Sequence, residues 1–198
     1  LYEALSTEHD VRIIAPDEDK SGSSHCITLT GAVKLKKIEE NWYCCFGTPA
    51  DCVLLSVLGA IPMKPDIIIS GINLGPNLGS DITFSGTTAA ARQGAIMGIP
   101  SFAVSLCSLQ PPFFFRGAVN FVQKNLKTLF SLWTPEHFVN VNVPNTDTAD
   151  LDVEITKLSQ PAYKSSLHSF TSPRGDQYYF FRGYPEEIKP KPGTDMAT

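Results

Sequence analysis

Residues 65–106 decide the fold, and they read PDIIISGINLGPNLGSDITFSGTTAAARQGAIMGIPSFAVSL. The apolar run at 65–71 is typical of a strand buried on both faces of a parallel sheet. The alanine-rich segment at 87–98 predicts a helix that packs closely on that sheet, and 99–106 predicts the next strand. A strand, a helix and a second strand in this order predict a doubly wound α/β fold.

Strands and helices also alternate on both sides of this stretch. We expect strands at 10–16 and 137–144, and an amphipathic helix at 116–130. The sequences at 27–38 and 41–47 alternate well enough for extended structure. Residues 1–150 are therefore the predicted α/β core, with a Rossmann-like, mostly parallel sheet.

The sequence predicts the start of one helix in detail. In residues 47–60, Thr48 is the predicted N-cap and Pro49 occupies the first helical position. Asp51 stands where its carboxylate can reach back to the N-cap residue, which predicts a capping box.

The predicted structure of the chain changes after residue 150. Residues 151–198 form a predicted C-terminal extension, and its aromatic segment at 165–184 predicts two strands around a Pro-Arg-Gly-Asp turn. A two-stranded hairpin is marginal alone in water. We therefore expect this β-hairpin to pack on the body or to act as an oligomerisation arm.

Composition narrows the possible functions. The chain has 198 residues, of which 42% are hydrophobic and 18% charged, and its net charge is −4, which argues against a general nucleic-acid surface. No run of about 18 apolar residues predicts a membrane span. Five cysteines without a CxxC pair favour free thiols in a reducing cytosol over a zinc site or a disulfide framework. We expect a cytoplasmic protein with no nucleic-acid or membrane partner.

Polar loops follow two of the predicted strands, and ligands of open α/β sheets bind at the carboxyl ends of strands. Asn73 and Asn77 lie in the Gly-rich loop after the strand at 65–71. An amide oxygen can bind Mg²⁺, and an amide N–H can donate to phosphate. The alternative is that both side chains merely hold turns.

The segment FSGTT at 84–88 opens the predicted helix that follows this loop. Free N–H groups at a helix start form a natural phosphate site, and Ser85, Gly86 and Thr87 lie there. The alternative role of Ser85 is ordinary N-capping, and the two roles are compatible.

The other loop, 17–26, contains Ser21 and His25 beside three acidic residues. A Ser–His–Asp arrangement is one interpretation, although no G-x-S-x-G motif places a nucleophile. The alternative is that His25 buttresses the loop. We keep His25 as a possible site residue.

Several motifs in this order resemble the survival protein E (SurE) family of metal-dependent nucleotidases: APDEDKSGSSHCITL, GTPADCV, SGINLGPNLGSDITFSGTTAAARQGAIMGIPSFAVSL and VNVNVP. The resemblance implies hydrolysis of nucleoside 5′- or 3′-monophosphates, and in some members of short polyphosphates. It implies a divalent cation, Mg²⁺ or Mn²⁺, and assembly as homodimers or homotetramers through the C-terminal arm.

The resemblance also implies roles for particular residues. Ser21 and Asn73 match two of the family's metal ligands. Asn77 matches a second family asparagine, and Ser85 matches the serine of its YSGT motif, with Phe84 in place of the tyrosine. Both are expected to contact phosphate, together with the Gly86 and Thr87 backbone amides.

The resemblance is incomplete in one respect that bears on activity. The family's remaining metal ligands are two aspartates of an Asn-Asp-Asp-Gly strand and loop, which the 198 residues do not contain. The catalytic residues are therefore unknown from this sequence. The first and last segments look like cut edges, so we expect further residues at both ends and an inactive segment when it is alone. The alternative functions are a non-catalytic nucleotide- or phosphate-binding module and an oligomeric scaffold.

Overall fold

The computed structural model describes residues 1–148, 151–159, 163–185 and 191–197. The chain forms two compact units. The first comprises Leu1–Asn77 and Asp81–Val153, and the second comprises Leu78–Ser80 and Glu154–Thr198. The domain boundary predicted at residue 150 falls outside the described residues.

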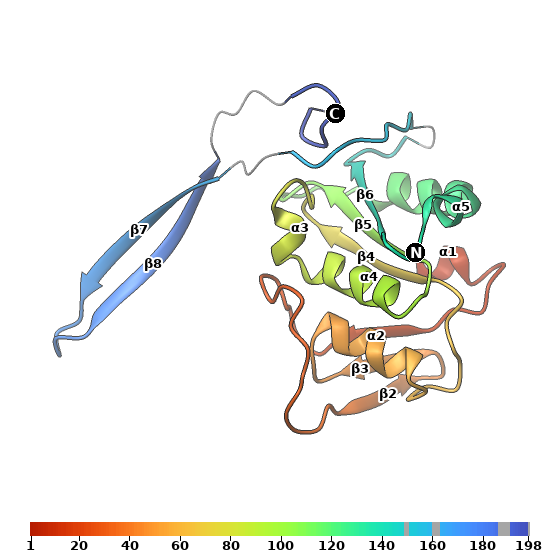
Figure 1. Cartoon of the computed structure of the whole chain (residues 1–198), viewed down its shortest axis with the longest axis horizontal. Helices are drawn as coiled ribbons and strands as arrows, with labels where there is room; N and C mark the ends of the chain where they lie inside the picture. The colour runs from red at the N-terminus through yellow and green to blue at the C-terminus, as the bar shows by residue number, and fades with distance from the viewer. Residues whose placement is uncertain (149–150, 160–162, 186–190, 198) are drawn as a thin grey trace. The chain divides into compact units, whose positions relative to one another are not determined.

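A parallel sheet forms the centre of the first unit (Figure 1). Its strands are β4 (Ile68–Leu74), β5 (Ser101–Cys107) and β6 (Val139–Pro144), in the order β4-β5-β6. All residues of β5 except Cys107 are buried, as a strand covered on both faces requires. β4 is only half-buried, because it forms an edge of this sheet among the described strands.

Two helices cover the opposite faces of this sheet. On α4 (Gly86–Ile96), a side chain at Gly94 would overlap Ser101 of β5, so the missing side chain lets helix and strand approach closely. α5 (Phe115–Leu132) buries Ala118 and Val122 on the other face. There they pack in two apolar clusters with residues of β5 and β6, namely Val104, Leu106 and Val143, and Leu5 of the short helix α1 (Tyr2–Leu5) joins one cluster. The alternation of strands and helices confirms the predicted α/β fold.

A second three-stranded sheet lies in the same unit. β1 (Ile13–Pro16) runs parallel to β3 (Trp42–Cys45), which pairs antiparallel with β2 (Leu35–Glu39). Only the last part of the extended segment predicted between 27 and 38 becomes a strand. Among the described residues no ladder joins β1 to β4, so the strands form two sheets.

Helix α2 (Pro49–Val57) begins as the sequence predicts. The Thr48 hydroxyl accepts a hydrogen bond from the Asp51 N–H, and the Asp51 carboxylate accepts one from the Thr48 N–H. This confirms the capping box. The helix packs against β1 and α4, which brings the start of α2 close to the start of α4.

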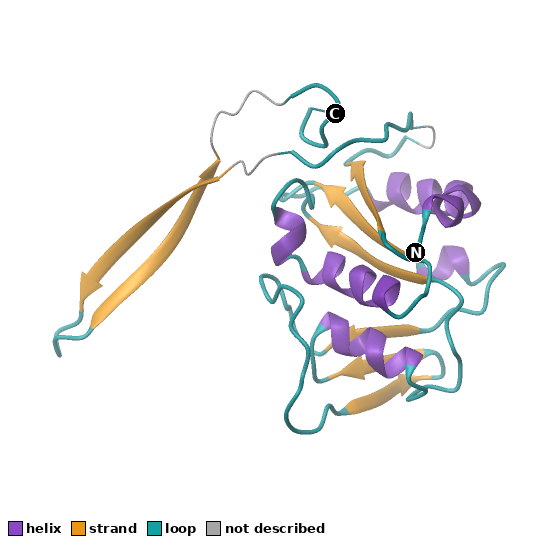
Figure 2. Cartoon of the chain, in the orientation of Figure 1, coloured by secondary structure: helices purple, strands orange, loops and turns teal. Residues whose placement is uncertain are grey.

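The second unit is built around a hairpin. β7 (Tyr163–Thr171) and β8 (Gln177–Pro185) pair antiparallel. Figure 2 draws the described residues of this hairpin as strands and not as a helix. Phe170 stacks on Tyr178 and Phe180, with ring centroids 5.1 and 5.9 Å apart. The predicted hairpin is confirmed.

The Asp195 carboxylate joins two other segments of the second unit. Asp195 accepts hydrogen bonds from the Gly79 N–H at 2.7 Å and from the Ser159 N–H at 2.8 Å. Gly79 belongs to the Gly-rich loop and lies 116 residues earlier in the chain.

No helix among the described residues is both long and apolar enough to cross a membrane.

Candidate functional site

A bulge in β4 sets the direction of Asn73. Ser70 pairs with Ala103 and Asn73 pairs with Ser105, so β4 holds one residue more than β5 between these pairs. Gly71 lies in the bulge with φ of +134°, and a side chain there would overlap the Val104 carbonyl oxygen. Such bulges re-aim side chains next to functional sites.

Asn73 is fixed by its own loop and by α4. Its Nδ2 donates to the Gly75 carbonyl at 2.8 Å, and its Oδ1 accepts from the Thr87 hydroxyl at 3.2 Å. The side chain is half-buried. An amide oxygen has two lone pairs, so Oδ1 keeps one for a cation.

Ser85 caps the start of α4, which is one of the two roles that the sequence suggests for it. The Ser85 hydroxyl accepts from the Thr88 N–H at 3.3 Å. The helix itself cannot satisfy its first N–H groups, which include those of Gly86 and Thr87. The cap therefore leaves amide donors and the positive end of the helix dipole beside Asn73.

The loop that carries Ser21 contacts the same helix start. The Ser24 N–H donates to the Phe84 carbonyl at 3.0 Å, and its hydroxyl donates to the Thr83 carbonyl at 2.7 Å. A side chain at Gly86 would lie 3.5 Å from the Lys20 carbonyl oxygen and 2.9 Å from Pro49. The loop after β1 and the segment between β4 and α4, which includes the short helix α3 (Asp81–Phe84), therefore meet at the first turn of α4.

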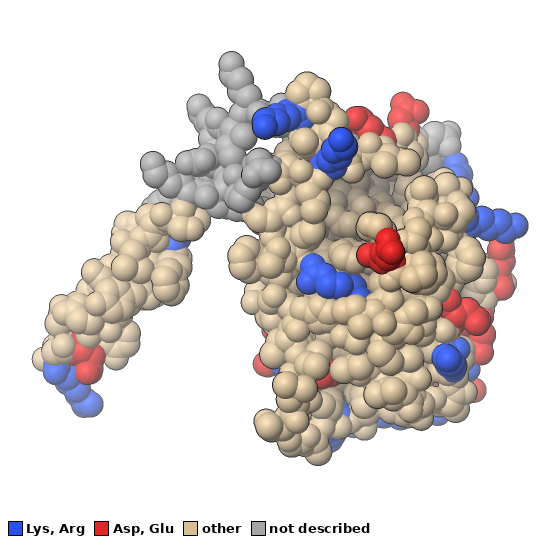
Figure 3. All heavy atoms as spheres, in the orientation of Figure 1, with Lys and Arg blue, Asp and Glu red and all other residues tan. Residues whose placement is uncertain are grey.

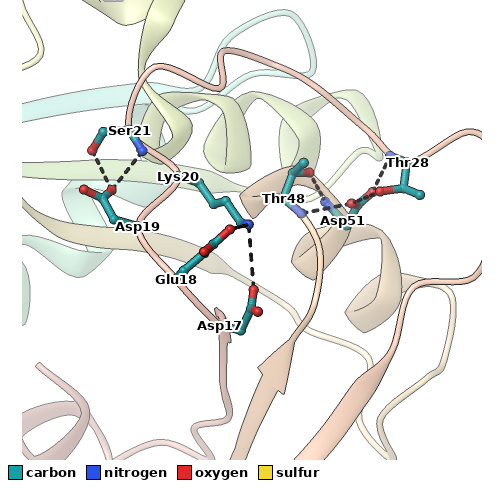
Figure 4. Close-up of polar contacts among 8 residues, drawn as sticks. All are labelled: Asp17, Glu18, Asp19, Lys20, Ser21, Thr28, Thr48 and Asp51. Carbon is teal, nitrogen blue, oxygen red and sulfur yellow. Dashed lines mark hydrogen bonds and ion pairs between the residues drawn. The ribbon is translucent and has the colours of Figure 1, made fainter.

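Ser21 itself is exposed and bonded within its loop. Both its N–H, at 2.8 Å, and its hydroxyl, at 2.6 Å, donate to Oδ1 of Asp19 (Figure 4). These two hydrogen bonds lower the pKa of Asp19. The serine oxygen keeps its lone pairs, and the carboxylate of one of the three acidic residues of this loop lies next to it.

Asp51 ties the far end of this loop to α2. Its carboxylate accepts from the N–H of Thr28 at 2.9 Å and from its hydroxyl at 2.7 Å, in addition to the capping bond with Thr48 (Figure 4). Burial raises the pKa of Asp51, but the hydrogen bonds from Thr28 and Thr48 outweigh it and the pKa is lowered. The carboxylate is thus held ionised inside the protein.

His25 pairs with α4. Its Nε2 lies 2.9 Å from Oε1 of Gln93, which is buried. This contact fits the buttressing interpretation. A catalytic role for His25 stays a prediction.

Asn77 lies deeper than the sequence suggests. It is 4% exposed, and its Nδ2 donates to the Ser105 hydroxyl at 2.7 Å. Asn142 and Asn140 of β6 bond its main chain. Sequence reasoning missed these three partners, although the alternation VNVNVP places both asparagines on one face of a strand. The phosphate-binding role predicted for Asn77 remains a prediction.

The donor set can hold only part of a metal's coordination shell. Ser21 and Asn73 offer neutral oxygens, which suit a hard cation such as Mg²⁺. Among the described residues no group of three or more His, Cys, Asp or Glu side chains could hold a metal ion.

On the face drawn in Figure 3, acidic and basic side chains of the described residues are interspersed.

Comparison with known proteins identifies the family of the chain. Residues 1–165 match the family model described as survival protein SurE. A "5′-nucleotidase SurE" of Pelobacter propionicus is 34% identical over 198 residues, which cover 99% of this chain and 80% of the relative. A protein of the same name from Nitrosococcus oceani is 36% identical, with 99% of this chain and 78% of the relative covered.

A solved structure extends the likeness to three dimensions. The crystal structure of the SurE protein from Aquifex aeolicus has a TM-score of 0.82 and 36% sequence identity, and covers 98% of this chain and 79% of that one. The family match, the relatives and this structure all point to the same family. The chain therefore belongs to the SurE family.

Proposed function

We propose that the protein is a metal-dependent phosphomonoester hydrolase that acts on nucleoside 5′- and 3′-monophosphates. The observation that carries the proposal is the meeting of two loops at the first turn of α4. One loop contains Ser21, and the other follows β4, whose Asn73 lies within 3.2 Å of Thr87. Relatives named 5′-nucleotidase support a nucleotide substrate. Short polyphosphate is a further substrate in this proposal.

Ser21 and Asn73 would hold a divalent cation, Mg²⁺ or Mn²⁺. When bound, the cation supplies polarisation of phosphoryl oxygens and a more acidic water. Mg²⁺ normally needs a carboxylate or a substrate phosphate among its ligands. The two aspartates implied by the family resemblance would supply that charge, and the 198 residues without them would bind metal weakly and lack activity.

The chain's own residues would bind the phosphoryl group. The N–H groups of Gly86 and Thr87 lie at a helix start, where the dipole favours an anion. Ser85 shapes this turn by capping it, and Asn77 completes the predicted set. Preorganised donors of this kind stabilise charge that develops on equatorial oxygens.

The test is phosphate release from AMP with Mn²⁺, measured on the full-length protein, including any residues beyond these 198, and on its Asn73→Ala variant. Asn41→Ala is the matched control, because Asn41 also uses its side-chain amide, bonding Tyr2 at 3.3 Å outside this site. We expect release by the parent and the control, and its loss in Asn73→Ala. The rival proposal is a non-catalytic nucleotide-binding module, which would bind AMP without releasing phosphate. In both proposals the protein is cytoplasmic.

We also propose that the β7–β8 hairpin joins copies of the chain into a homodimer or homotetramer. Its aromatic rings lie on both faces and remain open to solvent, with Phe180 56% and Phe181 87% exposed. A two-stranded ribbon with this much exposed apolar surface calls for a partner. A second copy supplies a hairpin of the same chemistry.

A further inference from the structure

A row of polar side chains crosses the parallel sheet. Asn73 of β4 pairs with Ser105 of β5, and Ser105 pairs with Asn142 of β6. Paired residues of neighbouring strands point to the same face. The row thus starts at the predicted cation ligand and ends on the far strand, where no site residue is predicted.

The alternation of β6 explains how asparagine reaches this face. Val141 and Val143 pack in the apolar clusters beneath α5. The residues between and before them, Asn142 and Asn140, therefore face the α4 side of the sheet. A strand whose two faces are covered differently can be apolar on one side and polar on the other.

Asn77 sits over this row and is bonded by it at several atoms. Its N–H donates to Asn142 Oδ1 at 2.8 Å, and its carbonyl accepts from Asn142 Nδ2 at 3.1 Å. The same carbonyl accepts from Asn140 Nδ2 at 2.9 Å. With the 2.7 Å bond from Asn77 Nδ2 to the Ser105 hydroxyl, the N–H, the carbonyl and the side-chain nitrogen of Asn77 each make a hydrogen bond.

The bonds of Asn142 act on the backbone of the Gly-rich loop. Gly75, two residues before Asn77, donates its N–H to the Leu106 carbonyl at 3.0 Å. Its own carbonyl accepts from Asn73. The loop is therefore attached to β5 at Gly75 and to β6 at Asn77, and the Asn73 side chain is bonded to Gly75, the first of these two residues.

We infer that Asn142 is a positioning residue for the site. It fixes the main chain of Asn77, and through it the Gly-rich loop to which the side chain of Asn73 is bonded. This inference rests on the proposed function. A displacement of about 1 Å at a reacting centre can cost 10²-fold in rate, so a residue of β6 can matter without touching substrate.

The test uses the full-length protein, with any residues beyond these 198, and two substitutions. Asn142→Ala removes both bonds to Asn77. Asn142→Asp keeps the acceptor for the Asn77 N–H and replaces the donor to its carbonyl with an oxygen that cannot donate. The matched control is Asn125→Ala, because the Asn125 amide donates to the Phe121 carbonyl at 2.9 Å within α5, away from the site.

Two measurements separate positioning from general stability. The first is hydrogen exchange of the Asn77 amide. The second is kcat and KM for AMP. We expect Asn142→Ala to speed the exchange at least about tenfold and to lower kcat about 10- to 100-fold with little change in KM. Asn142→Asp should keep most of the amide protection and lose less kcat. The control should change neither quantity.

The outcomes distinguish this inference from the proposed function. A parent protein that binds AMP without turnover overturns the nucleotidase proposal and, with it, the positioning role, even if the exchange result establishes the anchor. An active parent with an unchanged kcat in Asn142→Ala overturns the positioning role alone. Equal losses of kcat in Asn142→Ala and Asn125→Ala show a general effect of stability and also overturn it.

Discussion

Asp51 and Thr28 are joined by two hydrogen bonds across 23 residues of sequence, from the Thr28 N–H at 2.9 Å and from its hydroxyl at 2.7 Å. The same carboxylate caps α2 through Thr48. Gly47 has to lack a side chain here, because one would lie 2.7 Å from the carboxylate. One buried charge therefore fastens the loop that carries Ser21 to a helix start.

The substitution Asp51→Asn should destabilise the protein. An amide group in place of one carboxylate oxygen leaves a buried N–H donor without an acceptor, which costs about 1–3 kcal/mol. Chemical denaturation with urea measures this loss. Asp66→Asn is the control, because Asp66 is exposed and such surface changes cost within about 0.5 kcal/mol. Equal unfolding midpoints for the two variants would show that Asp51 does not hold the loop.

The same residue should make stability depend on pH in the acid range. The pKa of Asp51 is lower in the folded state than the value near about 3.9 of an unfolded chain. Its contribution is complete above that unfolded value and is lost as the pH falls through the folded pKa. We expect the parent to lose stability below about pH 4 more steeply than Asp51→Asn. Parallel curves for the two proteins between pH 3 and about 5 would refute this.

The cysteines should differ in reactivity. Cys45 and Cys52 are 0% and 6% exposed, and burial raises the pKa of both thiols, so they stay protonated at neutral pH. Cys26 is exposed. Iodoacetamide should therefore alkylate Cys26 in the native protein and reach Cys45 and Cys52 only after unfolding in urea. Peptide mass mapping checks the order, which native labelling of Cys52 would contradict.

The hairpin proposal makes a prediction about molecular size. Phe180→Ser should shift the protein toward monomer, because it removes a ring from the stack with Phe170. Phe130→Ser is a fair comparison, since Phe130 is 51% exposed on α5 in the other unit and Phe180 is 56% exposed. Light scattering after size-exclusion chromatography measures the mass. Deletion of 165–184 should have the larger effect, and an unchanged mass after it would exclude the hairpin as the joint.

Local patterns in the sequence predicted the elements well. The apolar run before Asn73, the capping residues Thr48 and Asp51 and the alternating segment at 137–144 each carry their signal within a few residues. Helix α5 shows the limit of such patterns. Phe130 lies in the amphipathic helix predicted at 116–130 and is 51% exposed, whereas the neighbouring Leu129 is 4% exposed.

The partners within the site could not be predicted in the same way. Whether Asn77 faces a ligand or Ser105 depends on the register of β4 against β5, including the bulge at Gly71. The bonds from Asp51 to Thr28 likewise depend on where a long loop returns. Such contacts between distant segments leave no periodic trace in the chain.

The row Asn73–Ser105–Asn142 has a consequence for how this protein can change during evolution. Strand side chains alternate, so the loss of one residue within β5 or β6 would rotate a member of the row to the opposite face. Extra residues in the turn that follows Cys107 would leave the row intact. Length variation should therefore be tolerated after these strands and rejected inside them, whatever side chains the surrounding loops acquire.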